Sequence, residues 1–214
     1  MKPEISIIFF LLVFIGQCFG QQVNYPAGGY MSLEELKNKQ PSIAKNFVVR
    51  KRTRDAINAA GGSDYLVISP DKSVKKNFIK KKLYAVSTGD SLYINCYFHG
   101  IQKWYSKVIS AGKLILFYGP MNNGDMDVAN SKVTDYAIMG GIIGVGLSGI
   151  GKIVDMRFLY VLDATEPFPI ARPVNEAIIR QVLEPYPLYL YQYENDPEKE
   201  KSETILHYLK MVNE

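Results

Sequence analysis

Two pairs of β-rich segments in the middle of the chain, each joined by a short loop with a glycine, constrain the fold more than any other feature. The pairs and their loops are 83–87 and 91–96 around Thr88-Gly89-Asp90, and 104–109 and 113–118 around Ser110-Ala111-Gly112. Glycine supplies the positive φ angle that tight turns require, and β-branched and aromatic residues favour strands. Strands joined so closely pair as antiparallel neighbours, so the pattern predicts an antiparallel β-meander.

Helices are predicted at both ends of this meander. Ser32 with Glu35 three residues later has the spacing of a capping box, and Pro41 ends the short helix that follows. Asn175 begins a second helix that reaches residue 183, and residues 198–212 have the apolar periodicity of an amphipathic helix. Further strands are expected at 47–53, 65–68, 156–162 and 187–193. The sequence therefore predicts an α+β fold, an antiparallel β-meander with a few short helices that include a C-terminal amphipathic helix.

The first twenty residues have the three-part pattern of a secretory signal peptide. Lys2 precedes an apolar run at 5–15, and a short polar and small segment ends at Gly20. The run is too short for a bilayer span, which needs about 20 residues. We expect export to the periplasm or cell envelope, with residues 21–214 as a single domain. The alternative is a lipid anchor on Cys18, which is disfavoured because Gln17 stands where a small residue is expected.

A glycine-rich apolar segment covers residues 137–154. It contains Gly144-x-Gly146-x-x-Gly149, but no parallel βαβ pattern surrounds it. It also resembles a P-loop, except that Ile153 replaces the Ser or Thr that holds magnesium. We therefore expect no nucleotide partner. A buried loop, a lid over an apolar pocket and a membrane-contacting segment all remain open for these residues.

No complete catalytic or metal-binding pattern is found in the sequence. Asp125 and Asp127 resemble the start of a calcium loop whose later glycine and acidic ligand are missing. Cys96 is expected to be a small buried apolar residue, with His99 on the opposite face of the same strand. With only two histidines in the chain, a histidine-rich zinc site cannot form. We expect no catalytic residues, no metal and no cofactor.

Charge is unevenly distributed along the chain. Residues 45–82 hold eleven basic and three acidic residues, a net +8, whereas residues 194–214 carry −3. Arg50, Arg52 and Lys80 belong to the basic segment. Export makes nucleic acid an improbable partner, and an anionic glycan or lipid surface is more available outside the cytoplasm. The simpler interpretation, which we favour, is a solvated face that keeps the protein soluble.

Aromatic residues give a second indication of a binding surface. The sequence has 15 tyrosines and one tryptophan, and Tyr189, Tyr191 and Tyr193 alternate with leucines in the strand expected at 187–193. An exposed row of these rings, joined by Trp104, could stack on sugar rings. The simpler interpretation is that Tyr and Leu cover the two faces of one strand. The candidate ligand-binding residues are Trp104, Tyr189, Tyr191, Tyr193, Arg50, Arg52 and Lys80.

Several phrases together resemble an uncharacterised family of small exported proteins from Bacteroidota. They are Gly29-Tyr30-Met31-Ser32-Leu33-Glu34-Glu35-Leu36 with Pro41-Ser42, then Tyr160-Val161-Leu162-Asp163 after the glycine-rich segment, then Glu203-x-Ile205-Leu206-x-Tyr208-Leu209. The resemblance implies a location in the cell envelope and an unknown activity. It offers no catalytic residues for this chain.

These observations favour a non-catalytic secreted or periplasmic envelope protein that binds an unidentified partner. One alternative is a hydrolase that uses carboxylates such as Asp125 and Asp127. Another is a membrane-surface protein that uses residues 137–154 together with the basic run at 72–82.

Overall fold

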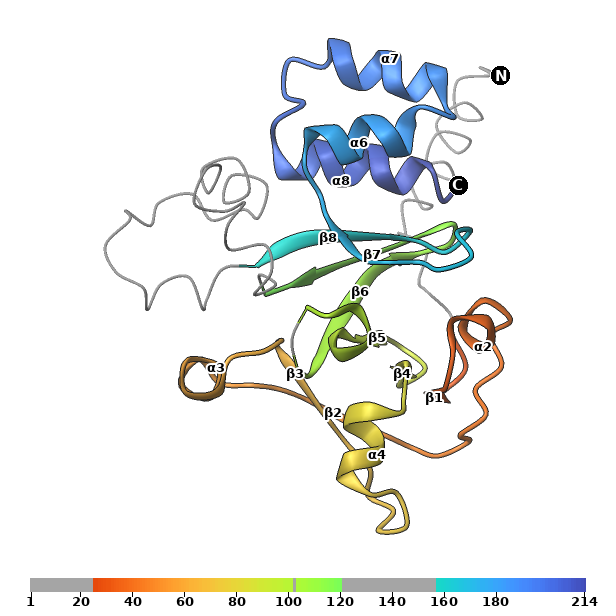
Figure 1. The fold of residues 1–214 in the computed structure, drawn as a ribbon, viewed down its shortest axis with the longest axis vertical. Helices are drawn as coiled ribbons and strands as arrows, with labels where there is room; N and C mark the ends of the chain where they lie inside the picture. The colour runs from red at the N-terminus through yellow and green to blue at the C-terminus, as the bar shows by residue number, and fades with distance from the viewer. Residues whose placement is uncertain (1–24, 102, 121–156) are drawn as a thin grey trace, which may run out of the picture.

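The computed structural model of the chain describes residues 25–101, 103–120 and 157–214 (Figure 1). Four sequence predictions fall outside these ranges: the signal peptide at 1–20, the alternative anchor at Cys18, the carboxylates Asp125 and Asp127, and the glycine-rich segment at 137–154.

The described residues form an α+β fold, as the sequence predicts. The strands are β1 (Gly28–Tyr30), β2 (Val48–Lys51), β3 (Tyr65–Ile68), β4 (Ala85–Ser87), β5 (Leu92–Asn95), β6 (Tyr105–Ala111), β7 (Leu114–Gly119), β8 (Phe158–Asp163) and β9 (Arg172–Pro173). The helices are α2 (Leu33–Lys37), α3 (Arg54–Ala60), α4 (Lys76–Lys81), the 3₁₀ helix η2 (Cys96–His99), α6 (Glu176–Leu183), α7 (Pro187–Asn195) and α8 (Ser202–Met211). Helix α8 confirms the predicted amphipathic C-terminal helix.

The strands of the described residues pair in one antiparallel sheet with the order β1-β4-β5-β6-β7-β8-β9. The predicted hairpins β4–β5 and β6–β7 both form, with Gly89 at a φ of 91° in the first turn. Strands β2 and β3 pair with each other and join the sheet where Tyr65 pairs with Tyr105. Residues 105–107 of β6 pair with β5 and residues 108–111 pair with β7, and the β6–β7 register shifts between Val108 and Ser110. The two ends of the sheet carry different helices (Figure 1).

Strands β7 and β8 are apolar on both faces because both faces are covered. Leu114 and Leu116 point to a cluster formed with α6, α7 and α8, whereas Ile115 and Phe117 point to a cluster shared with β1, β4 and β5. Figure 1 shows the three C-terminal helices lying over one face of these two strands. Nearly continuous apolar strands are the pattern expected of a strand buried on both sides.

The other end of the sheet carries α2, α3 and α4. Helix α2 begins as predicted, because the Ser32 hydroxyl accepts a hydrogen bond from Glu35 N and the Glu35 carboxylate accepts one from Met31 N. A separate apolar cluster lies beneath α4 and includes Ile79, Val86 and Tyr105. In Figure 1, α3 and α4 lie at the end of the molecule opposite to α6, α7 and α8.

The strand predicted at 187–193 is wrong, because these residues belong to helix α7. Pro187 occupies the first turn, where a missing N–H costs nothing. The side chains that pack against the core follow the helical spacing i, i+3, i+4, i+7, and they are Tyr186, Tyr189, Leu190 and Tyr193. The run of alternating Tyr and Leu fits both the period of a strand and the period of a helix. Packing against α6 and α8 favours the helix.

A second correction concerns Cys96 and His99. The strand ends at Asn95, whose side-chain oxygen accepts a hydrogen bond from Tyr97 N, and η2 follows. The chain no longer alternates between two faces, so Cys96 and His99 are both buried instead of lying on opposite faces of a strand. Cys96 itself is fully buried, as expected for a small apolar residue.

Candidate functional site

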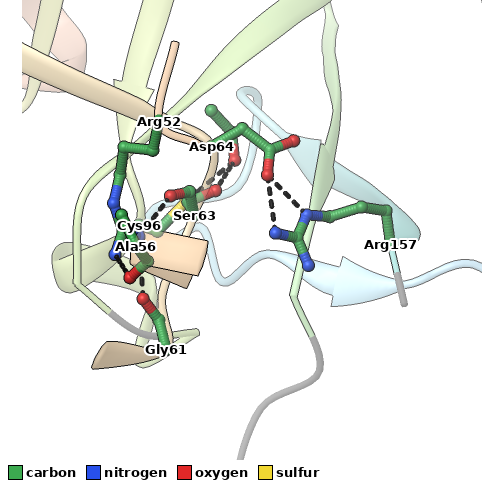
Figure 2. Close-up of polar contacts among 8 residues, drawn as sticks. Arg52, Ala56, Gly61, Ser63, Asp64, Cys96 and Arg157 are labelled. Atoms are coloured by element: carbon green, nitrogen blue, oxygen red, sulfur yellow. Dashed lines mark hydrogen bonds and ion pairs between the residues drawn. The ribbon is translucent and has the colours of Figure 1, made fainter. Parts of the chain in front are cut away.

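Arg52, which follows strand β2, hydrogen-bonds to helix α3 and to the segment between α3 and β3. Its guanidinium donates to the backbone oxygens of Gly61 (2.7 Å), Ser63 (2.8 Å) and Ala56 (2.7 Å). Figure 2 shows the Arg52 side chain beside Ala56, Gly61 and Ser63. Gly61 is the C-cap of α3 and Ser63 follows it, at the helix end where a cation is favoured, whereas Ala56 lies within the helix.

An ion pair between Asp64 and Arg157 lies next to Arg52 (Figure 2). Arg157 Nη2 and Nε lie 2.6 and 2.7 Å from Asp64 Oδ1, and both side chains are largely buried. The pKa of Arg52 is lowered mainly by burial and also by the Arg157 charge, while Asp64 opposes the shift. Asp64 thus forms its ion pair with Arg157, and the Arg157 charge lies close enough to Arg52 to affect it.

Trp104, the single tryptophan of the sequence, packs beside Arg52. The Lys80 Nζ atom lies 4.5 Å from the centre of the Trp104 ring, and Arg52 Cζ lies 5.1 Å from it. Both distances are within the range of cation–π attraction. The indole edge rests on Gly62, where an added Cβ would lie only 2.5 Å from Trp104 Cδ1. A glycine at 62 is therefore needed for the ring to occupy this place.

The conformation of Trp104 is costly in two ways. Its φ is 79°, in a region that a bulky residue rarely adopts. Its indole N–H is buried and has no hydrogen-bond acceptor within the described part of the chain. Each feature costs on the order of 1–3 kcal/mol. Strain of this kind is typical of functional positions.

Helix α4 places a group of lysines beside Trp104. Tyr105 Oη donates to Ile79 O at 2.6 Å, and Asn95 Nδ2 donates to Lys80 O at 3.0 Å and Leu83 O at 2.8 Å. These buried bonds fix the C-terminal turn of α4 to the sheet. The helix and its flanks expose six lysines, and none of them forms an ion pair with another described residue: Lys72, Lys75, Lys76, Lys80, Lys81 and Lys82.

The 3₁₀ helix η2 adds two exposed rings to this end of the molecule. Tyr97 is 50% exposed and Phe98 is 42% exposed. Helix η2 packs against α4, and Cys96 N at its start donates to Trp104 O at 3.0 Å. We call the following residues the basic–aromatic surface: Arg52, Lys80 and Trp104, which are in contact, the exposed Lys103 that precedes Trp104, and Tyr97 and Phe98 on the adjoining η2.

A small polar network lies beneath this surface. Ser106 Oγ contacts Cys96 Sγ at 3.2 Å and also hydrogen-bonds Ser63 Oγ. All three side chains are buried, and burial raises the pKa of the Cys96 thiol. A buried, protonated thiol is a poor nucleophile, so the network acts in packing and connects β3, η2 and β6.

The candidate binding residues predicted from the sequence lie at two separate ends of the structure. Arg52, Lys80 and Trp104 come together on the basic–aromatic surface, and Arg50 is exposed on the neighbouring strand β2. The tyrosines of α7 lie at the other end of the molecule. Tyr193 is buried against Tyr208, Tyr189 stacks on Tyr186, and Tyr191 is 67% exposed.

Sequence reasoning missed Tyr97, Phe98 and the supporting Gly62. The first two lie in a run that has strand composition, so no pattern marks the 3₁₀ turn that exposes them. Gly62 follows another glycine, Gly61, and such a pair indicates an unusual backbone without indicating its neighbour.

The described residues lack both a membrane-spanning helix and a metal-binding cluster. None of their helices has the length and apolarity that a membrane crossing needs. They also contain no group of three or more His, Cys, Asp or Glu side chains placed to hold a metal ion.

Comparison with known proteins gives one match. Residues 28–214 match the model of a family of unknown function, DUF6563. No curated protein and no solved structure matches the chain. Because the match covers most of the sequence and all the described elements, the chain belongs to this uncharacterised family, DUF6563.

Proposed function

We propose that this protein is a non-catalytic, exported envelope protein that binds an anionic polysaccharide through the basic–aromatic surface. The observation that carries the proposal is Trp104, held in a strained conformation between Lys80 and Arg52. Rings beside unpaired cations can contact the apolar face of a sugar while the cations attract its carboxylate or sulfate groups.

An anionic glycan fits this surface better than a lipid bilayer does. The elements at this end carry three exposed large apolar side chains, Val48, Tyr97 and Phe98, and each is 50% exposed or less. Binding to a membrane interface requires a continuous apolar face that is buried among the lipid headgroups. More fully exposed apolar side chains, such as Phe168 and Leu188, lie in the β8–β9 loop and on α7.

Fluorescence titration of residues 21–214 tests the ligand class, because Trp104 is the only tryptophan. We expect heparin, a sulfated polysaccharide, to change Trp104 emission, with an affinity that falls as salt increases. Dextran, which is neutral, should have no effect. Equal binding of dextran would contradict the proposal, and binding only to phosphatidylglycerol vesicles would assign the surface to lipid instead.

A matched pair of double variants tests the location. Lys80→Ala with Lys103→Ala removes two charges from the basic–aromatic surface, and Lys199→Ala with Lys201→Ala removes two from the helical end. We expect the first pair to weaken heparin binding by about tenfold, or about 1.4 kcal/mol, and the second to have little effect. Equal losses would show that net charge alone binds the polymer.

Export forms a separate part of the proposal. The pattern at 1–20 supports cleavage after Gly20, and the resemblance to exported proteins of Bacteroidota supports an envelope location. Mass spectrometry of the mature protein from its native host should find Gln21 at the N-terminus. An acylated Cys18 at the N-terminus would instead indicate a lipid-anchored protein. An intact Met1 would contradict export.

A further inference from the structure

Two neighbouring aromatic side chains, one of them in η2, bury polar atoms that have no partner among the described residues. Tyr84 and His99 are each 8% exposed. The Tyr84 hydroxyl and both ring nitrogens of His99 form no hydrogen bond within residues 25–101, 103–120 and 157–214. Buried polar atoms in proteins are nearly always satisfied by protein or by ordered water, so three at one place require an explanation.

The surrounding structure holds both rings in place. Tyr84 N donates to Tyr30 O, and Asn95 N donates to Tyr84 O, so the backbone at Tyr84 is tied to β1 and β5. His99 ends η2, which is closed by Gly100 in a left-handed conformation and by Ile101 N donating to Cys96 O. These bonds fix the backbone from which each ring projects.

The two rings lie within an aromatic group. Tyr84 and His99 are arranged edge to face with ring centres 5.5 Å apart. Phe98 lies 5.7 Å from Tyr84, and Phe117 lies 6.2 Å from His99. Neither phenylalanine ring has a hydrogen-bonding oxygen or nitrogen, so among the described residues these ring neighbours leave the three polar atoms without a partner.

The chemistry of the two side chains defines what molecule could serve as that partner. Burial lowers the pKa of His99 to about 4, so the ring is neutral near pH 7 and offers one donor and one acceptor. Burial raises the pKa of Tyr84, so its hydroxyl also remains neutral and can donate or accept. An uncharged pair of this kind suits a small neutral molecule with both functions, and water is the smallest such molecule.

We propose that Tyr84 and His99 form a buried water site, in which an ordered water molecule hydrogen-bonds to the Tyr84 hydroxyl and to a His99 ring nitrogen. This site is independent of the basic–aromatic surface, although η2 contributes to both. Its water links β4 to η2 through side chains that do not bond to each other directly.

Comparison of Tyr84→Phe with Tyr30→Phe tests this proposal through thermal stability. Tyr30 is fully buried and its hydroxyl donates to Pro26 O at 2.8 Å. Removing this hydroxyl therefore measures the effect of breaking one known hydrogen bond of a buried tyrosine. If water is bound, both variants should lower the melting temperature by similar amounts, on the order of 2–8 °C. If Tyr84→Phe leaves the melting temperature unchanged or raises it while Tyr30→Phe lowers it, the site is dry and the proposal is wrong.

Nuclear magnetic resonance of the unmodified protein provides a second test that requires no folded variant. We expect a persistent cross-peak between water and the His99 ring N–H, observed after exchange with bulk solvent has been filtered out. Absence of this cross-peak, with the ring N–H itself observed, would overturn the proposal.

Discussion

The two ends of the molecule use charge in opposite ways. At the helical end, Arg180 pairs with both Glu176 and Glu194, and Lys201 pairs with Glu198. At the basic end, the lysines of α4 and its flanks form no ion pair with described residues. Charges that neutralise each other within the chain stabilise the fold slightly, whereas unpaired charges of one sign attract a partner. This difference supports the proposal that the basic end binds a partner and the helical end supports the fold.

The exposure of paired aromatic rings also differs between the two ends, because one pair is buried at the helical end and another is about half exposed at the basic end. Tyr193 and Tyr208 of α7 and α8 pack edge to face with ring centres 5.5 Å apart and are buried. Tyr97 and Phe98 of η2 also pack edge to face, but both remain about half exposed. The same residue types thus fill a core at one end and cover a surface at the other. Aromatic content alone therefore does not reveal which rings bind a ligand.

Truncation of the helical core should give the largest effect. Leu209 of α8 is fully buried against β7 and β8, so Leu209→Ala should lower the free energy of unfolding by about 2–5 kcal/mol. Leu188→Ala on α7 is the control, because Leu188 is 64% exposed, and its cost should stay within about 0.5 kcal/mol. Chemical denaturation measures both. Similar costs would show that the three helices do not form a packed core.

Acidification should destabilise the basic end through His99. The pKa of His99 is lowered from 6.5 to about 4 by burial, so below pH 6.5 the unfolded chain binds a proton that the folded chain excludes. Stability should therefore be complete above pH 6.5 and fall as pH decreases toward 4, by a total of roughly 3 kcal/mol. Denaturation at several pH values measures the slope.

The variant His99→Phe separates this effect from the protonation of carboxylates. It should flatten the pH dependence between 6.5 and 4 relative to the unmodified chain, whatever its stability at pH 7. His207→Gln is the control, since His207 is exposed on α8 and its replacement leaves His99 in place. A pH profile that is unchanged in His99→Phe would show that another group is responsible.

Gly62→Ala should disturb the basic–aromatic surface with an intermediate effect. The φ of Gly62 is 88°, and the new methyl group would meet the Trp104 ring. Backbone strain and the displaced ring together should lower the free energy of unfolding by about 1–3 kcal/mol. Emission from Trp104 should shift to longer wavelength as the ring becomes more exposed. Gly89→Ala in the β4–β5 turn has a similar φ of 91° and open surroundings, so it should leave the emission unchanged.

Local signals in the sequence were sufficient for much of the fold. The glycine turn at Gly89 predicts its hairpin, and Ser32 with Glu35 predicts the start of α2, because these structures depend on residues close in the chain. Helix α7 could not be distinguished from a strand, because its side chains satisfy both periods and distant contacts decide between them. Local pattern therefore predicts turns and caps better than it predicts a run of uniformly apolar and aromatic residues.

The candidate site was only partly predictable for a related reason. The basic composition and the rarity of tryptophan suggest Arg52, Lys80 and Trp104, and the fold brings these three together. The exposure of Tyr97 and the burial of His99 depend on the 3₁₀ turn after Asn95, which no local residue pattern indicates. The water site at Tyr84 and His99 likewise requires two segments to meet in three dimensions.

The smallest effect should come from neutralising one lysine of α4. Lys76 and Lys80 lie four residues apart on the same helix face, so Lys76→Gln should remove a repulsion and raise the free energy of unfolding by about 0.2–0.5 kcal/mol. At the helical end, Arg180→Gln breaks two ion pairs and should lower the free energy of unfolding. The two variants should therefore change the free energy of unfolding in opposite directions, because the α4 lysines form no ion pair with described residues and Arg180 forms two. If Lys76→Gln instead destabilises the protein, the α4 lysines have a structural role, and the division between a binding end and a scaffolding end fails.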